Sequence, residues 1–201
     1  MAGLITLILF GVLQGITEFL PVSSSGHLSL FQYFSRELNE NLSLNIAVHI
    51  GTLLTILIYY RVDLKEIING IKNRDRESIG MVSMIVVASI PTAIIGLVLK
   101  KKADWILTNP VVAASCLVIT GLILLVSDKF QRGESFQTGF GIGVKQALLI
   151  GIVQGCAVLP GISRSGSTIV AGLFLGMNPK NASRFSFLVS VPAIAGAGLL
   201  E

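Results

Sequence analysis

The stretch FGVLQGITEFLPVSSSG, residues 10–26, begins as an apolar helix and is then interrupted by a proline and three serines. A similar stretch, IGIVQGCAVLPGISRSG, occupies residues 150–166. In an ungapped alignment the identical pairs are Gly11 and Gly151, Gln14 and Gln154, Gly15 and Gly155, Ser23 and Ser163, Ser25 and Ser165, and Gly26 and Gly166. Paired interrupted segments in a membrane protein are typical of an internal repeat, often of inverted topology, with the functional site at its interface.

Composition places the chain in the membrane. Of its 201 residues, 52% are hydrophobic and 13% are charged, and the mean hydropathy is +0.79. Soluble domains carry about 25% charged residues, and a soluble fold of this size could not bury so much apolar surface. No polar linker divides the chain, so we expect one integral membrane domain over 1–201, with repeat 1 at about 1–100 and repeat 2 at about 104–201.

Apolar runs of about 20 residues are long enough to cross a bilayer. The predicted spans are Ser43–Tyr60, Ile79–Leu99, Trp105–Ser127 and Phe185–Leu200. Two further runs, Leu4–Leu20 and Val144–Leu159, end at Pro and Ser/Gly-rich stretches before apolar sequence resumes. Backbone groups freed by such breaks are tolerated only inside protein or beside water. The sequence therefore predicts an all-α polytopic membrane protein with two re-entrant or broken helices.

The charge pattern favours lipid over nucleic acid. The formal charge is +4, from 15 Lys and Arg against 11 Asp and Glu. The excess sits in short connections, such as an expected loop over 61–77, and no basic stripe with interleaved aromatic residues occurs. We therefore expect contact with membrane lipids and no nucleic-acid partner. Cys116 and Cys156 lie in apolar segments without metal-ligand spacing, which is typical of buried structural residues.

Few ionisable residues fall at membrane depth, where each costs roughly 3 kcal/mol. They are Glu18, His27, His49, Lys145 and Arg164. Three of them, Glu18, His27 and Arg164, lie at or beside the two breaks. We expect His49 to be a hydrogen-bonded packing residue, and Lys145 to extend its ammonium group to the interface.

The broken segments carry the residue types that phosphoryl chemistry needs. Glu18 follows Gln14 by one helical turn, so both lie on one face. A serine-rich turn before a new helix offers hydroxyl and backbone N–H groups to an anion. The second turn adds Arg164, whose planar fork matches a phosphate. The hydroxyl and glycine positions concerned are Ser23, Ser24, Ser25, Gly26, Ser163, Ser165, Gly166 and Thr168.

Other interpretations of the same residues stay open. Glu18 and Arg164 could form a structural ion pair that joins the repeats, and the serines could satisfy broken backbone. A site built on metal alone fits less well because Glu18 is the single nearby carboxylate. A diphosphate substrate could supply the remaining oxygen ligands of Mg²⁺ or Ca²⁺. The architecture also suits a transporter that moves a prenyl-phosphate lipid without cleaving it.

QGITEFLPVSSSGHL (14–28) and PGISRSGSTI (160–169) resemble the two signature motifs of the undecaprenyl-diphosphate phosphatase family, of the bacitracin-resistance type. The resemblance covers essentially the whole chain. It implies a multi-pass enzyme of the bacterial inner membrane with interlocked inverted repeats and two re-entrant helix pairs. The implied reaction is hydrolysis of a phosphoric anhydride: removal of the terminal phosphate of undecaprenyl diphosphate, which regenerates the carrier lipid for peptidoglycan synthesis.

The resemblance also implies residue roles. Gln14 and Glu18 match the acidic or amide pair of the first motif, and the family's serine and histidine match Ser24 and His27. Arg164 matches its phosphate-binding arginine. The expected catalytic set is Glu18, Ser24, His27 and Arg164, with Glu18 also holding a divalent cation. The expected substrate-binding set is Gln14, Ser23, Ser25, Gly26, Ser163, Ser165, Gly166 and Thr168.

The sequence leaves the nucleophile open between Ser24, His27 and direct attack by water. Members of the family continue for several dozen residues beyond the segment that matches Phe185–Leu200, so we expect the second repeat to be incomplete. A shortened relative that binds lipid diphosphates without turnover is therefore a further alternative, beside the transporter. The sequence does not indicate an oligomeric state.

Overall fold

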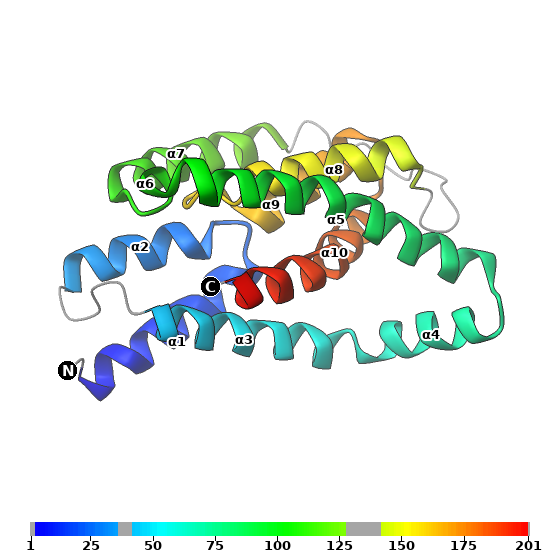
Figure 1. Cartoon of the computed structure of the whole chain (residues 1–201), viewed down its shortest axis with the longest axis horizontal. Coiled ribbons are helices and arrows are strands. Elements are labelled where there is room, and N and C mark those ends of the chain that lie inside the picture. Colours follow the sequence, from blue (N-terminus) through cyan, green and yellow to red (C-terminus); the bar gives the residue numbers. More distant parts are fainter. Residues whose placement is uncertain (1–2, 36–41, 128–141, 201) are drawn as a thin grey trace.

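The computed structural model describes residues 3–35, 42–127 and 142–200, and within these ranges it is helical and without strands. Most helices run roughly along the long axis of the molecule (Figure 1). In that view α5, α7 and α8 lie along one side, α1, α3 and α4 along the other, and α2 and α10 between them. The predicted all-α fold is confirmed.

The first predicted break is present. Helix α1 (Leu4–Phe19) ends before Pro21, and α2 (Ser24–Ser35) begins after a short turn. Ser23 adopts a left-handed backbone with φ of 66°, which is uncommon for a residue with a side chain. The chain therefore reverses abruptly, and α2 packs back against α1.

The second break has the same form. Helix α8 (Val144–Cys156) is followed by a turn and then by α9 (Arg164–Phe174). Gly161 in this turn has φ of 91°, and a Cβ there would collide with the carbonyl oxygen of Ala113 in α7. Only glycine combines this backbone conformation with so close an approach. Helix α7 thus supports the turn directly.

The predicted spans are confirmed in part. Helices α5 (Arg76–Lys102) and α7 (Pro110–Ser127) are long and apolar enough to cross a membrane. Helix α3 (Leu42–Tyr59) passes that test only together with α4 (Arg61–Lys72), from which it is bent by 67°. Helix α10 (Pro179–Leu200) is not among the spans found in the described ranges. Polar residues occupy its first two turns.

Two boundaries differ from the sequence prediction. The span expected from Trp105 is divided into a short helix α6 (Asp104–Leu107) and α7, because Asn109 caps the backbone N–H of Val111 with its side chain at 2.9 Å. The loop expected over 61–77 is wrong, since most of it forms α4. That helix buries Ile67, and Asp63 forms a 2.5 Å ion pair with Arg184 at the start of α10.

Apolar side chains cover much of the outer surface. Leu4 and Ile5 of α1, and Val111 and Leu125 of α7, are each at least 70% exposed. So many exposed large apolar side chains indicate contact with lipid. The buried interior is small and contains polar groups beside Phe10 and Phe185. The chain is therefore a multi-pass membrane protein with an apolar exterior and several buried polar side chains.

Candidate active site

The two interrupted turns lie directly against each other. A Cβ on Gly26 would stand 2.8 Å from the Cα of Gly161, and one on Gly166 would stand 3.0 Å from the carbonyl oxygen of Pro21. Glycines therefore allow the two backbones to touch. As a result, the first turns of α2 and α9 begin side by side, and the positive ends of two helix dipoles converge.

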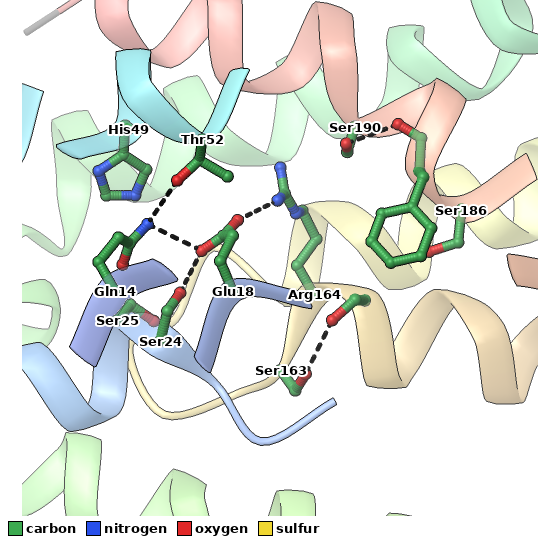
Figure 2. A network of polar contacts seen from close by, with 12 residues as sticks. Gln14, Glu18, Ser24, Ser25, His49, Thr52, Ser163, Arg164, Ser186 and Ser190 are labelled. Atoms are coloured by element: carbon green, nitrogen blue, oxygen red, sulfur yellow. Dashed lines mark hydrogen bonds and ion pairs between the residues drawn. The ribbon is translucent and has the colours of Figure 1, made fainter. Parts of the chain in front are cut away.

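Glu18 stands at this junction and is only 8% exposed. Its Oε1 forms an ion pair with the guanidinium of Arg164. Its Oε2 accepts hydrogen bonds from the hydroxyl of Ser24 and from Nε2 of Gln14, the latter at 3.1 Å (Figure 2). Four expected site residues from α1, α2 and α9 thus form one network around a single carboxylate.

Arg164 is the first residue of α9 and joins the two halves of the chain through its bond to Glu18. Its side chain is 21% exposed, so it is partly accessible from outside the buried network. A planar guanidinium beside a helix N-terminus is suited to an anionic oxygen group. The predicted alternative, an ion pair between Glu18 and Arg164, is present in this structure.

The serines on both turns make matching hydrogen bonds. In the first turn Ser23 Oγ accepts from the Gly26 N–H at 3.3 Å and lies 3.3 Å from Ser25 Oγ. In the second turn Ser163 Oγ accepts from the Gly166 N–H at 3.0 Å and lies 3.4 Å from Ser165 Oγ. These hydroxyls therefore hold the turns in shape, as one sequence alternative proposed, and they line the same junction.

The expected site residue Thr168 lies behind the turn. Its hydroxyl bonds the carbonyl of Arg164 at 2.8 Å and the hydroxyl of Ser186 in α10 at 2.6 Å. Thr168 is 2% exposed. It therefore braces the first turn of α9, and its position explains how it could act on Arg164 without contacting a ligand.

The two histidines are placed differently from each other. The Nδ1 of His27 bonds the carbonyl of Ser23 at 2.8 Å, and within the described ranges no hydrogen bond or ion pair joins it to Glu18 or Arg164. The Nδ1 of His49 bonds the carbonyl of Asn45 at 2.8 Å, and its ring lies beside Gln14 in Figure 2. His49 is thus hydrogen-bonded as expected, but at the edge of the network. Lys145 is exposed, in keeping with an interfacial ammonium group.

Sequence reasoning missed three hydroxyl residues. Thr52 of α3 accepts a hydrogen bond from Gln14 at 3.2 Å. Thr120 of α7 accepts from the Ser163 N–H at 3.0 Å and donates to the carbonyl of Gly161 at 2.7 Å. Ser186 supports Thr168 from α10. None of the three belongs to a recognisable motif, so only their polarity at membrane depth could have identified them.

The donor set suits a hard cation only with help from a ligand. The described residues contain no cluster of three or more His, Cys, Asp or Glu side chains. Glu18 supplies one carboxylate, and the hydroxyls around it are hard oxygen donors. Mg²⁺ and Ca²⁺ prefer oxygen ligands, and phosphate oxygens of a substrate complete such sites in many enzymes. The residues therefore fit a divalent cation whose coordination a diphosphate completes.

Fold and site together define a helical membrane protein with a buried carboxylate, guanidinium and hydroxyl cluster suited to phosphoryl chemistry. The chain matches the family model of bacitracin resistance protein BacA over residues 7–201. It belongs to that family.

Curated relatives extend the match. A protein of Desulfosudis oleivorans is 45% identical over 208 residues, which cover 96% of this chain and 75% of the relative. Proteins of Methanococcus maripaludis and Thermosipho melanesiensis are 40% and 42% identical, again over 96% of this chain, and over 77% and 76% of their own lengths. All three are named undecaprenyl-diphosphatase.

Proposed function

We propose that this protein is an undecaprenyl-diphosphatase, a membrane hydrolase that removes the terminal phosphate of undecaprenyl diphosphate and releases the monophosphate carrier lipid. The observation that supports this most is the contact between Glu18 and Arg164 at the junction of the two broken helices. It gathers an acid–base group, an anion-binding group and a hydroxyl at membrane depth, where a lipid-borne diphosphate is presented. The curated relatives carry the same activity in their names.

Substrate binding would begin at Arg164. Its guanidinium is partly exposed, and it stands at the N-terminus of α9 beside that of α2. A diphosphate carries more negative charge than a carboxylate and offers bidentate oxygens. It would therefore compete with Glu18 for the guanidinium. Binding in this way would also leave Oε1 of Glu18 free of its ion-pair partner.

The geometry favours Ser24 as the nucleophile over His27. The Ser24 hydroxyl already donates to Glu18, so nucleophile and base lie within hydrogen-bond reach. Ser24 Oγ would attack the terminal phosphorus while its proton passes to Glu18, and the bond from that phosphorus to the bridging oxygen would break. The prenyl monophosphate departs, and water then hydrolyses the phosphoserine. His27 has no such partner among the described residues.

A divalent cation, Mg²⁺ or Ca²⁺, is part of the proposal. Glu18 would hold it together with oxygens of the diphosphate, and it would supply charge neutralisation at the transferred phosphoryl group. The proposed setting is the bacterial inner membrane, with membrane lipids around the chain and the lipid diphosphate as substrate.

The test is phosphate release from a long-chain prenyl diphosphate by the purified protein in detergent, with and without Mg²⁺ or Ca²⁺. The matched control is Arg164→Ala, checked for folding by its circular dichroism and thermal midpoint. Cation-dependent release that disappears in the control is the expected result. A folded protein that binds the substrate without releasing phosphate would contradict the proposal. A liposome flux assay with an uncleavable analogue would then test transport.

A further inference from the structure

Two buried glutamines make the same contact at matching positions of the two broken helices. Gln14 of α1 donates from Nε2 to Thr52 Oγ1 of α3 at 3.2 Å, and Gln154 of α8 donates from Nε2 to Thr92 Oγ1 of α5 at 3.1 Å. Both glutamines are 1% exposed. The two pairs thus form equivalent Gln–Thr contacts, one in each half of the chain.

The direction of the contact at Thr52 follows from the hydroxyl's own bonding. Thr52 donates its single proton to the carbonyl of Val48 at 3.0 Å, one turn earlier in α3. Towards Gln14 it can therefore act only as an acceptor. Gln14 accordingly points its amide nitrogen, and not its oxygen, at Thr52.

The same nitrogen also donates to Oε2 of Glu18 at 3.1 Å. Both amide protons of Gln14 are thereby committed, one to Thr52 and one to Glu18. Within the described ranges Oε1 of Gln14 has no hydrogen-bond partner. The orientation of this amide therefore rests on its two nitrogen contacts alone (Figure 2).

We propose that Thr52 is a positioning residue for the phosphatase reaction: it fixes the Gln14 amide so that its Nε2 stays on the Glu18 oxygen that faces Ser24. This inference rests on the proposed function. When a diphosphate draws Arg164 away, Gln14 and Ser24 are the remaining hydrogen-bond partners of Glu18 seen in this structure. The charged and titratable groups that face Glu18 from the packed helices are Arg164 of α9 and His49 of α3. A held amide keeps the carboxylate aligned to take the Ser24 proton.

The second contact supplies a matched control. Thr92 donates to the carbonyls of Ala88 and Gly151 at 3.0 and 2.9 Å, so it too accepts from its glutamine. At the position that matches Glu18, however, the second half carries Val158. The Thr92 contact therefore joins α5 to α8 without touching a carboxylate. Its loss should affect stability and leave the chemical step alone.

The experiment compares Thr52→Val, Thr52→Ser and Thr92→Val in steady-state hydrolysis of a prenyl diphosphate, with thermal midpoints measured on the same samples. Thr52→Val should lower kcat about tenfold, the size expected when the hydrogen bond from Gln14 to the charged Glu18 is lost. KM should stay within about twofold, because neither Thr52 nor Gln14 contacts Arg164. Thr52→Ser should restore most of the turnover. Thr92→Val should lower the thermal midpoint and leave kcat unchanged.

An infrared measurement separates this inference from the phosphatase assignment. The carboxylate stretch of Glu18 can be assigned by difference from Glu18→Gln, with no turnover required. It should shift in Thr52→Val, return in Thr52→Ser and stay in place in Thr92→Val. An unshifted band or an unchanged kcat in folded Thr52→Val would overturn the role of Thr52, as would an equal loss of kcat in Thr92→Val. A shifted band in a protein without hydrolytic activity would support Thr52 and overturn the phosphatase.

Discussion

The two broken helices share their hydrogen bonds but differ in their chemistry. Ser23 and Ser163 each accept from the glycine N–H three residues later, and Gln14 and Gln154 each contact a threonine. Yet Glu18 is matched by Val158, and Arg164 is matched by Ser24. A common backbone pattern thus carries the carboxylate in one half and the guanidinium in the other.

Two similar backbone segments can therefore build an asymmetric site. Neither half alone contains both charges, and the ion pair forms between residues 146 positions apart. Because the turns cross at Gly26 and Gly161, residues that do not match in sequence become neighbours in space. The division of the chain into two inverted repeats stays a prediction.

The halves also differ in how closely their glycines are packed. Gly151 and Gly155 of α8 face α5 so closely that a Cβ would collide with Ala88 and Ile95. On α1, a Cβ at Gly11 or Gly15 would meet no atom of the described residues within 4 Å. A cavity of about 320 Å³ lies here between α1 and α3. Helix α8 is therefore tightly packed at these glycines, and α1 has open space at the matching ones.

The largest effect is expected from removing the planar guanidinium that the second half contributes to the site. Arg164→Lys keeps the charge but loses the planar fork, so kcat/KM should fall about a hundredfold, the size seen when a key transition-state donor is removed. Steady-state hydrolysis, with circular dichroism as the folding control, measures it. Near-normal turnover would mean that Arg164 acts only as a generic positive charge.

The packing difference is tested by the same substitution on each side. Gly151→Ala should destabilise the protein by about 1–3 kcal/mol, because its Cβ would overpack against Ala88 and Pro91. Gly11→Ala should be neutral or slightly stabilising, because alanine favours helix and space is open. Thermal midpoints in detergent decide the matter. Equal midpoints for the two variants would show that α1 and α8 are packed equally closely at these glycines.

A smaller effect is expected at the edge of the first half. His49→Gln should keep turnover within about threefold of the unmodified protein, because glutamine can still hydrogen-bond and the network around Glu18 keeps its other members. Hydrolysis rates across pH measure it. An inactive but folded variant would show that His49 belongs to the catalytic site and contradict its place at the edge of the network.

The smallest effect is expected at Asp75, which caps α5 outside the junction of the two turns. Ser163, by contrast, caps α9 within that junction. Backbone and side-chain hydrogen bonds from Ser78 lower the pKa of Asp75, the N-cap of α5. A lowered folded-state pKa gives stability that is present above the unfolded pKa and is lost as pH falls through the folded value. Asp75→Asn should remove this component. The thermal midpoint should therefore change with pH slightly less in Asp75→Asn than in the unmodified protein. Identical pH dependence of the two midpoints would contradict this contribution of Asp75.

Particular residues show what sequence could and could not predict. The breaks after Leu20 and Leu159 were predicted because proline, glycine and serine act on their immediate neighbours, and in the structure α8 already ends at Cys156. Helix α4 was predicted to be a loop because the segment is rich in charged residues. Its apolar face became clear only from its packing against α5. His27 follows the serine turn in sequence, yet its ring bonds the backbone of Ser23 and not the Glu18 network. Thr52 belongs to no recognisable motif, so its polarity at membrane depth is the single signal that the sequence gives.

The membrane setting, the two interrupted helices and the residue types at the site all follow from the amino-acid sequence, because composition and local backbone preference act over a few residues. The contacts of Glu18 with Arg164 and Ser24, and of Gln14 with Thr52, follow only from the packing of the helices. Those contacts join different helices. They exist because α3 packs on α1 and the two glycine-lined turns touch, which no local pattern specifies.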